Sequence, residues 1–454
     1  MTGKERIRKA FSFEETDRIP WVPFVGVHGG YLTGENAENY LKSSKCIVNG
    51  VSKAIELYKP DGIPVCFDLQ AEAEALGCRL KWAADNPPAV VSHPLEGNMD
   101  TGLLPEFTKE AGRIPVFMEA SRVLRKKHPG IALYGLITGP FTLALHLAGT
   151  NIFMQMMESP DEVIELMEYC KDITKKMASW YIREGCDVIA VVDPMTSQID
   201  PVSFESFVSP PAIELFEHIR QEEALGSFFV CGFAQQNIEA MCRCKPDNIS
   251  IDENIPLSYV KEIAKELKVS FGGNLKLTSV LSMGSVRDVE LHTLETVEQG
   301  GDSGFILAPG CDLVMDTPAD NLIAVGRVVS DTYHREFLKT LDSAGSSIEA
   351  SDLSGYWKDD KLIIDIITLD SSSCAPCQYM VEAVKLAAEK YGDLAICNEY
   401  SIKTRDGISM MKALGVKNVP VTVMDGEVRF ISQIPPSSQI DSAIREKLAA
   451  KNLL

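Results

Sequence analysis

Short apolar runs alternate with longer amphipathic stretches through the first three quarters of the chain. Segments with helical spacing of apolar residues, such as 161–183, 210–221 and 286–299, separate the runs. Eight strands that alternate with helices predict a (β/α)8 barrel, and a doubly wound parallel sheet is the alternative. The runs predicted to be strands, most of which end in Gly, Asp, Asn or Cys, are 19–26, 62–68, 131–139, 188–193, 227–231, 248–252, 269–274 and 304–308.

The composition changes near residue 340, where small and polar residues predominate. We therefore predict a barrel domain over 1–338, a linker over 339–356 and a small α/β domain over 357–454. An Asp-Gly pair at 425–426 predicts a hairpin turn in the second domain. Its predicted strands are 362–369, 394–400, 419–423 and 427–431, and its predicted helices extend to residue 390 and over 407–414 and 438–448.

The composition of the chain argues against nucleic-acid binding, a membrane span and secretion. The chain has 454 residues and a formal net charge of −20, which argues against nucleic acid as a partner because binding it requires a basic face. No apolar run approaches the length of a membrane span, and no apolar segment follows the basic N-terminal residues as in a secretory signal. With twelve cysteines and no export signal, we expect a reducing, cytoplasmic compartment in which thiols serve metals or redox chemistry.

Two cysteines directly follow or end apolar runs of the predicted barrel. Cys231 ends the fifth run, and Cys311 follows the eighth. Chemistry in such barrels is located at the C-terminal ends of the strands, so this pair is a candidate for half of a zinc site or for a redox couple. Gly232 and Gly310 lie beside the thiols, and glycine allows a ligand or a backbone to approach closely.

The C-terminal domain carries the sequence Cys374-Ala-Pro-Cys377 after a predicted strand and at the start of a helix. The N–H groups and the positive dipole end of that helix lower the pKa of the first thiol, so we predict that Cys374 attacks and Cys377 resolves. A zinc ribbon is the alternative, but no second cysteine pair lies nearby. Residues 357–454 resemble the thioredoxin/glutaredoxin family, in which a cis proline faces the two cysteines, and Pro420 matches by position.

Several motifs of the first domain occur together in the order of a known superfamily. They are Asp-Arg-Ile-Pro at 17–20, the stretch 67–77, Gly-Arg-Ile-Pro at 112–115, Thr-Gly-Pro-Phe-Thr at 138–142, residues 185–188, 250–253 and 273–274, and Leu-Ala-Pro-Gly-Cys at 307–311. With these motifs the domain resembles the uroporphyrinogen decarboxylase superfamily, and more closely its methylcobamide:thiol methyltransferase branch. The decarboxylases use an arginine-rich N-terminal segment for their polyanionic substrate, whereas residues 21–31 contain no arginine. Asp68 falls at the position of their pyrrole-facing aspartate, but this match by itself does not support decarboxylase activity.

In the methyltransferase branch, a His-x-Cys pair and a later cysteine bind zinc, which holds the acceptor thiolate for attack on a methyl-corrinoid. The resemblance gives Cys231 and Cys311 as metal ligands, but Phe229 occupies the histidine position. Three alternatives remain for the cysteine pair. The first is a zinc site with another ligand, such as Glu72, Asp193 or His146. The second is a redox couple without a metal, and the third is a chemically inert pair.

The sequence thus predicts zinc-dependent methyl transfer between a methylcobalamin-type corrinoid, carried by a corrinoid protein, and a thiol or other small nucleophile. Asp68 and Asp193 are the predicted polar contacts in the cavity. Asp252, with Gly232 and Gly310, is predicted to line the cofactor's approach, and helix capping is the alternative for Asp193 and Asp252. The fused dithiol, supplied by a thiol reductant system, could keep the barrel cysteines or a thiol substrate reduced. A redox or corrinoid-binding accessory protein without methyl transfer is the second hypothesis, and a uroporphyrinogen decarboxylase is the third.

Overall fold

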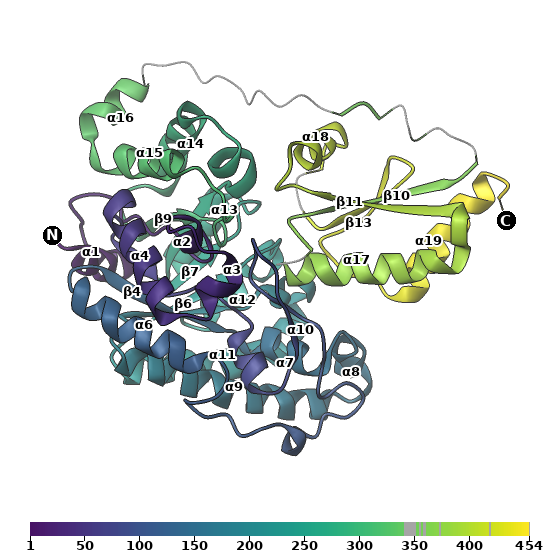
Figure 1. Cartoon of the computed structure of the whole chain (residues 1–454), viewed down its shortest axis with the longest axis horizontal. Coiled ribbons are helices and arrows are strands. Elements are labelled where there is room, and N and C mark those ends of the chain that lie inside the picture. The colour runs from purple at the N-terminus through teal and green to yellow at the C-terminus, as the bar shows by residue number, and fades with distance from the viewer. Residues whose placement is uncertain (340–350, 354–355, 357–359, 372–373, 417–418, 454) are drawn as a thin grey trace. The chain divides into compact units, whose positions relative to one another are not determined.

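A computed structural model of the chain describes residues 1–339, 351–353, 356, 360–371, 374–416 and 419–453. The chain divides into two compact units, Met1–Ala344 and Gly345–Leu454. Most of the predicted linker lies outside the described residues. Each unit is built around its own sheet (Figure 1).

Seven parallel strands form the sheet of the first unit, in the order β1-β4-β5-β6-β7-β8-β9. A pair of two-residue strands, β2 and β3, forms a separate hairpin outside this sheet. The fold class predicted from the sequence is confirmed. The strand bounds are β1 Gly62–Pro64, β2 Leu80–Lys81, β3 Ala89–Val90, β4 Ala132–Thr138, β5 Val188–Val192, β6 Leu225–Val230, β7 Asn248–Ile251, β8 Ser270–Leu275 and β9 Phe305–Pro309.

The prediction of a strand over 19–26 was wrong. This segment forms one parallel bridge, between Trp21 and Leu307, rather than a strand of the sheet. The main chain of this segment bonds to β9 on one side, through Val22 N–H to the Leu307 carbonyl at 2.9 Å. On the other side, Asp61 N–H donates to the Trp21 carbonyl at 2.9 Å, just before β1. The segment therefore closes the barrel between its first and last strands, in the place of an eighth strand. Pro20 and Pro23 flank the bridge and lack the N–H groups that a longer ladder requires.

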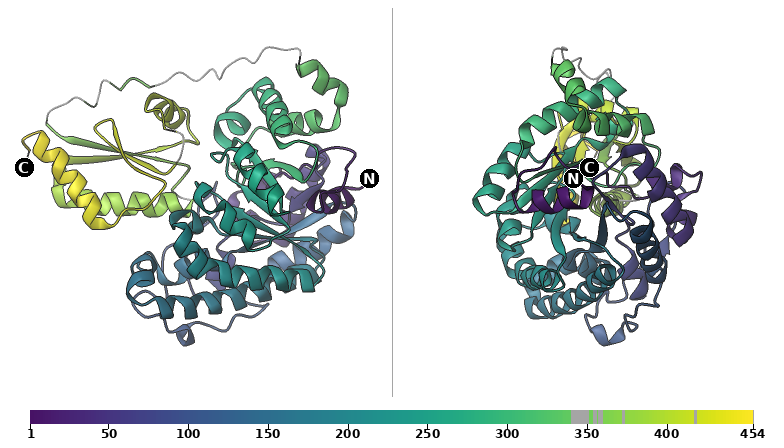
Figure 2. Two further views of the ribbon diagram at one scale, coloured as in Figure 1. Left: turned by 180° about the vertical axis from the view of Figure 1, so that it is seen from behind. Right: turned by 90° about the vertical axis from the view of Figure 1, so that its left-hand side faces the viewer.

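Helices form the outer layer around the strands (Figure 2). Longer helices such as α9 turn an apolar stripe inward, because buried residues recur at helical spacing along it. The α-helix bounds are α1 Gly3–Phe11, α2 His28–Tyr31, α3 Ala37–Leu41, α4 Ser44–Tyr58, α5 Ala71–Ala75, α6 Ile114–Lys127, α7 Pro140–Ala148, α8 Ile152–Glu158, α9 Pro160–Arg183, α10 Pro201–Ser203, α11 Ser209–Gln221, α12 Ile238–Arg243, α13 Leu257–Glu266, α14 Val286–Gly300, α15 Ala319–Ser330 and α16 Thr332–Lys339.

The second unit has a four-stranded sheet in the order β11-β10-β12-β13. The pair β10·β11 is parallel and the other two pairs are antiparallel. Helices α17 and α19 lie on one side of this sheet and α18 on the other (Figure 1). The element bounds are β10 Leu362–Thr368, α17 Ala375–Ala388, β11 Ala395–Ser401, α18 Arg405–Ala413, β12 Val421–Met424, β13 Glu427–Ile431 and α19 Ser437–Ala450.

The predicted hairpin turn of the second unit is present. Asp425 and Gly426 join β12 to β13, with φ of +48° and +78°. Both angles belong to the left-handed region that a two-residue hairpin turn of this kind requires, which explains the Asp-Gly pair. The peptide bond from Val419 to Pro420 is cis, as the resemblance implied.

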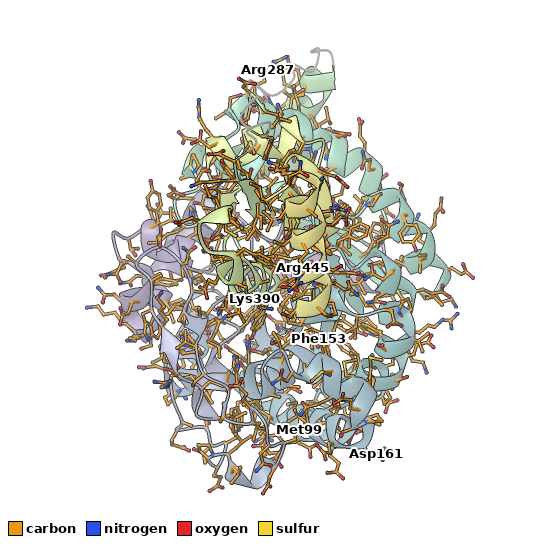
Figure 3. All side chains as sticks on the ribbon, turned by 90° about the vertical axis from the view of Figure 1, so that its right-hand side faces the viewer. Met99, Phe153, Asp161, Arg287, Lys390 and Arg445 are labelled. Carbon is orange, nitrogen blue, oxygen red and sulfur yellow. A yellow bond between two sulfur atoms is a disulfide. The ribbon has the colours of Figure 1, made fainter. Side chains whose placement is uncertain are left out.

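Charged side chains such as Asp161, Lys390 and Arg445 are exposed (Figure 3). The interior of the barrel is apolar, with residues of β4, β5, β6 and β9 in one cluster. Among the residues that the structure describes, no helix combines the length and apolar character needed to cross a membrane.

Candidate active site at the rim of the barrel

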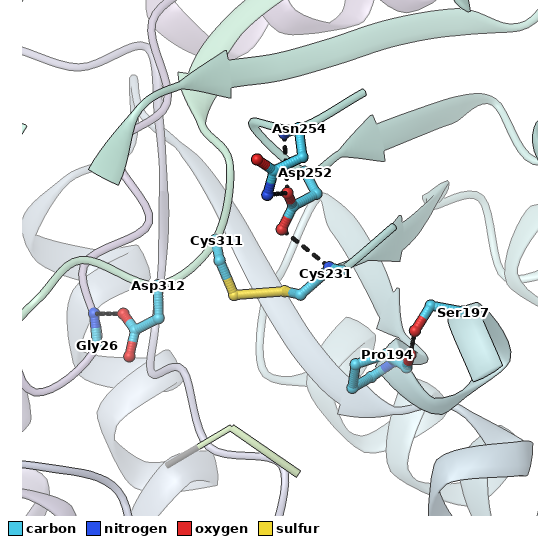
Figure 4. Close-up of a disulfide and its surroundings, with 9 residues drawn as sticks. Gly26, Pro194, Ser197, Cys231, Asp252, Asn254, Cys311 and Asp312 are labelled. Atoms are coloured by element: carbon cyan, nitrogen blue, oxygen red, sulfur yellow. Dashed lines mark hydrogen bonds between the residues drawn. A yellow bond between two sulfur atoms is a disulfide. The ribbon is translucent and has the colours of Figure 1, made fainter. Parts of the chain in front are cut away.

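Cys231 and Cys311 meet at the C-terminal ends of their strands. Cys231 directly follows β6, and Cys311 lies two residues after β9. Although β7 and β8 separate these strands in the sheet, the two cysteines form a disulfide with a Cα–Cα distance of 5.9 Å (Figure 4). Both residues are partly exposed, so the pair is accessible at the rim. The sequence prediction that these two thiols lie together agrees with this geometry.

The two glycines beside the pair have different structural roles. Gly232, directly after Cys231, has a φ of +92°, a conformation that residues with side chains rarely adopt. At Gly310, a Cβ atom would lie 2.5 Å from the backbone nitrogen of Glu253. Glycine at 310 therefore lets the loop after β7 pass close beside the loop that carries Cys311. The close approach at this position is that of the Glu253 backbone, and the role predicted for Gly310 at a cofactor remains a prediction.

Two carboxylates anchor the loops that carry the cysteines (Figure 4). Asp252 accepts a hydrogen bond from Gly232 N–H at 2.8 Å, and its other oxygen accepts from the N–H and the side-chain amide of Asn254. Asp312 accepts from Gly26 N–H at 2.8 Å. Each bond fixes a residue that neighbours a cysteine, so the pair is held in place by more than its own covalent link. The role predicted for Asp252 at a cofactor remains a prediction.

An aromatic cluster lies next to the two cysteines. Phe229 is fully buried, and its ring centroid lies 4.7 Å from that of Phe24 and 5.8 Å from that of Phe67. Cys231 and Cys311 pack against the core cluster that contains these rings. A hydrocarbon ring thus stands where the resemblance places a metal-binding imidazole.

The donor set at the rim does not fit a zinc ion. Among the residues in the described ranges, no group of three or more histidine, cysteine, aspartate and glutamate side chains is placed so that it could hold a metal. Zinc takes four ligands in structural sites and three protein ligands in catalytic ones. The oxygens of Asp252 already accept hydrogen bonds, and Phe229 has no donor atom. The two sulfur atoms therefore lack, among the described residues, the further ligands that a zinc ion requires.

Asp68, the predicted catalytic aspartate, follows β1 and is paired with Arg113. The Arg113 guanidinium donates to both carboxylate oxygens of Asp68 and, at 2.7 Å, to Glu74. Burial costs the charged Arg113 hydration, but the two carboxylates outweigh this cost and raise its pKa. Its guanidinium carbon lies 4.8 Å from the ring centroid of Trp82. Asp68 is thus neutralised by an ion pair with a side chain of the same chain.

Glu72 is a fully buried carboxyl group behind the rim. Burial raises its pKa to about 7, against the opposing effect of hydrogen bonds from Thr138. Thr138 N–H donates to Oε1 at 3.0 Å. The Thr138 hydroxyl lies 2.8 Å from both Oε2 and the Leu69 carbonyl oxygen. Because one hydroxyl has one hydrogen, all these contacts are satisfied together when Glu72 is protonated and donates to Thr138.

Asp193, the other predicted catalytic aspartate, follows β5 and binds the start of α7. It accepts from Thr142 N–H at 2.8 Å, from the Thr142 hydroxyl at 2.6 Å and from Phe141 N–H at 3.1 Å. Burial raises its pKa to about 6. This carboxylate satisfies N–H groups at a helix N-terminus that have no partner within the helix. Its contacts agree with the capping alternative, and a role in the cavity remains a prediction.

The two histidines near strand ends differ in their surroundings. His28 is buried and bonds through Nδ1 to the Met315 carbonyl and through Nε2 to the Tyr58 hydroxyl. His146, on α7, is also buried, and neither ring nitrogen has a hydrogen-bond partner among the residues that the structure describes. Burial lowers its pKa to about 3, so the ring is neutral. Neither histidine joins the two rim cysteines in a metal-binding group within the described chain.

The second unit places its dithiol at the start of α17. Cys374 is the N-cap residue of the helix and is partly exposed, whereas Cys377 lies in the first turn and is fully buried. Leu369 N–H donates to the Cys377 sulfur at 3.3 Å. Burial, together with the adjacent Cys374, raises the pKa of Cys377. The geometry separates an accessible thiol from a protected one.

The fold and its two sulfur sites define a two-unit α/β protein, a parallel barrel with a cysteine pair at its rim followed by a dithiol unit. The chain belongs to the uroporphyrinogen decarboxylase (URO-D) family, whose model matches residues 2–332. A thioredoxin domain model matches residues 364–445.

The methyltransferases among the similar proteins are matched over nearly their whole length, and a decarboxylase over about three quarters. Methylcobamide:CoM methyltransferase MtbA of Methanosarcina mazei is 26% identical over 330 residues, which are 71% of this chain and 95% of the relative. Methylcobamide:CoM methyltransferase MtaA of Methanosarcina barkeri is 27% identical over 340 residues, with 71% and 96% covered. Uroporphyrinogen decarboxylase of Trichodesmium erythraeum is 23% identical over 275 residues, with 58% and 76% covered. A solved methyltransferase from Methanosarcina mazei has the same fold, with a TM-score of 0.68 at 23% identity, covering 75% of this chain and all of that one.

Two residues of the site had no role assigned from the sequence. Arg113 lies in the Gly-Arg-Ile-Pro motif at 112–115, and a lone arginine in a shared motif was the signal that could have singled it out. Asp312 directly follows Cys311, so its position beside a candidate ligand was also visible. Their partners could not be read from the sequence, because Asp68 and Gly26 are distant along the chain.

Proposed function

We propose that the barrel unit transfers a methyl group between a methyl-corrinoid, presented by a corrinoid protein, and a small thiol. The observation that carries this proposal is the likeness to methylcobamide:CoM methyltransferases over 95% of their length. The position of a sulfur pair at the rim, where barrels of this type bind their substrates, supports it further.

In such a transfer, the acceptor sulfur forms a bond to the methyl carbon while the bond from that carbon to the donor breaks. The electron pair of the broken bond stays with the donor, and the acceptor thiol loses its proton. The rings of Phe24, Phe67 and Phe229 give the floor of the site an apolar surface that excludes water. Zinc was part of the sequence prediction, but the described residues at the rim do not offer a donor set that fits it.

The dithiol of the second unit is proposed to be redox active. Cys374 is the accessible attacking thiol, and Cys377 is the buried resolving thiol. We propose that this dithiol, recharged by a cellular thiol reductant system, keeps a thiol substrate or the barrel cysteines reduced. The ten cysteines outside the disulfide are free, which supports a reducing compartment such as the cytoplasm.

A redox or corrinoid-binding accessory protein without methyl transfer is the second candidate. Phe229 in place of a metal-binding histidine and the joined Cys231–Cys311 pair favour it. The decarboxylase is a weaker third candidate because Asp68 is paired with Arg113, and residues 21–31 offer no arginine to a polyanion.

The experiment is an assay of the full chain with methylcobalamin and a panel of small thiols, coenzyme M included, under a dithiol reductant. We expect loss of the methylcobalamin absorption spectrum with matching formation of a methyl thioether, detected by mass spectrometry. Cys231→Ser and Cys311→Ser report on the rim, and Cys46→Ser is the control because Cys46 is a partly exposed thiol on α4. Absence of transfer to every thiol, with disulfide exchange retained, would favour the accessory protein. Coproporphyrinogen formed from uroporphyrinogen would establish the decarboxylase.

A further inference from the structure

The cysteines of the barrel unit fall into two groups. Cys231 and Cys311 are partly exposed at the rim, as is Cys46 on α4. The others are buried, and burial raises the pKa of their thiols, which makes them poor nucleophiles: Cys66, Cys78, Cys170, Cys186, Cys242 and Cys244. Thiol chemistry in this unit is therefore concentrated at the rim pair.

We propose that Cys231 and Cys311 form a thiol–disulfide exchange site, which dithiols reduce and small disulfides oxidise. Their Cα–Cα distance of 5.9 Å lies within the range that a disulfide spans without backbone movement, roughly 4.4–6.8 Å. Their partial exposure gives an attacking thiolate access to the bond. The inference goes beyond methyl transfer, because the exchange requires neither a methyl donor nor an acceptor.

The reduced pair keeps its geometry because the loops have independent anchors. Asp252 accepts from Gly232 N–H, next to Cys231, and Asp312, next to Cys311, accepts from Gly26 N–H. Gly310 packs against the backbone of the loop after β7, so the loop of Cys311 is also confined sterically. Opening the disulfide leaves these contacts in place. The two thiols then remain neighbours, and the high effective concentration favours closing the bond again.

The surroundings favour exchange over metal binding. No third donor accompanies the two sulfur atoms among the described residues, and both cysteines pack against the apolar cluster that contains Phe229. The carboxylate of Asp252 already accepts hydrogen bonds at both oxygens. A pair of cysteines without further ligands has the composition of a redox couple.

The exchange balances in two steps. A thiolate of the dithiol attacks one sulfur atom of the Cys231–Cys311 bond, which breaks and releases the other cysteine as a thiolate. The second thiol of the reductant then attacks the mixed disulfide and releases the first cysteine. The reductant becomes a disulfide, and two electrons and two protons pass to the pair. Cys374 and Cys377 are a dithiol of the required class, on the same or another copy of the chain.

The test is a redox titration of the full chain in buffers of reduced and oxidised dithiothreitol. After acid quenching and alkylation, mass spectrometry quantifies the peptide in which Cys231 and Cys311 are linked. We expect a reversible transition in which each tenfold change in the buffer ratio changes the ratio of open to closed pair by about tenfold. Cys231→Ser and Cys311→Ser should each leave the remaining cysteine alkylated at every ratio, and Cys46→Ser should leave the transition unchanged.

Two results would overturn the inference. The pair could stay fully alkylated at every ratio while the protein holds zinc that both serine variants lose, which would define a metal site. Alternatively, the link could persist in the native protein at every dithiol concentration, which would define a permanent structural disulfide. Circular dichroism of each variant verifies folding, and the titration of the unmodified chain decides the question if a variant fails to fold. Because the readout is a peptide mass, a failure of methyl transfer does not affect it.

Discussion

The guanidinium of Arg113 binds both carboxylate oxygens of Asp68, across 45 positions of the chain. Arg113 immediately precedes α6, and Asp68 follows β1, so the pair connects a helix of the outer layer to the end of a barrel strand. Both side chains are almost completely buried. A buried charge that loses its partner is costly, and this makes the pair a sensitive point of the structure.

Replacing Arg113 with methionine should lower the free energy of unfolding by about 3 kcal/mol or more, because two carboxylates lose their cation in a buried site. Urea denaturation of the full chain measures the change. Arg122→Met, on α6 itself, is the matched control, since Arg122 pairs with Glu184 at the surface and its loss should cost less than about 1 kcal/mol. An equal loss of unfolding free energy in the two variants would show that the buried ion pair contributes no more to stability than the exposed one.

Gly310→Ala should disturb the loop of Cys311. The new Cβ would lie 2.5 Å from a backbone nitrogen, so the main chain must shift, at a cost of roughly 1–3 kcal/mol. We expect lower stability and a smaller fraction of linked Cys231–Cys311 under the same redox buffer. At Gly130 the nearest atoms lie at 3.8 Å, so Gly130→Ala should be nearly neutral. An unchanged stability of the Gly310→Ala variant would mean that the loop after β7 can move aside without an energetic cost.

Glu72 should make stability depend on pH. Because burial raises its folded-state pKa from 4.5 to about 7, the folded state retains a proton that the unfolded state releases. Its contribution to stability is therefore complete below pH 4.5 and is lost as the pH rises through about 7, on the order of 3 kcal/mol. Glu72→Gln, whose amide can also donate to Thr138, should flatten this slope.

Denaturant unfolding at several pH values between 5 and 8 tests this dependence, with Glu74→Gln as the neighbouring control on the same helix. An unchanged slope in Glu72→Gln would assign the dependence to another group, such as Asp193, whose pKa is about 6.

The two cysteines of the second unit should react in a fixed order. In the reduced full chain, iodoacetamide should modify Cys374 first, since Cys377 is fully buried and burial raises its pKa. Cys377→Ser should trap a mixed disulfide at Cys374 with a small disulfide probe, and Cys374→Ser should trap none. Cys397→Ser, which removes another partly exposed thiol, should behave as the unmodified chain does. A stable adduct at Cys377 in the Cys374→Ser variant would reverse the assignment.

The periodic pattern of the sequence predicted the strands of the barrel well, because each lies in a core that demands continuous apolar residues. The exception is the segment around Trp21, where the apolar pattern is right but Pro20 and Pro23 limit pairing to a single bridge. Hydrophobicity indicates burial, whereas the number of available N–H groups decides the length of a ladder.

Within the site, the meeting of Cys231 and Cys311 followed from the fold class, because strand ends converge at one rim. The partners of Asp193 did not follow. Its place after a strand suggested a cavity, whereas its oxygens bind the start of α7, and Gly139 permits this contact because a Cβ there would lie 2.3 Å from that of Asp193. Contacts between loops depend on side-chain directions that a one-dimensional pattern does not contain.

The closure of the barrel by Trp21 and Leu307 has a consequence for synthesis. The segment around Trp21, which completes the ring, is made early in the first unit. Its partner strand, which contains Leu307, is among the last parts of that unit to leave the ribosome. The ring therefore stays open while most of the first unit is being translated. At roughly 5–20 residues per second, the ribosome then needs several more seconds to make the second unit. Cys231 and Cys311 are therefore both made before Cys374 and Cys377 of the same chain exist. Under the exchange proposed above, a disulfide that closed at this early stage would be opened by a dithiol on an older molecule or by small thiols.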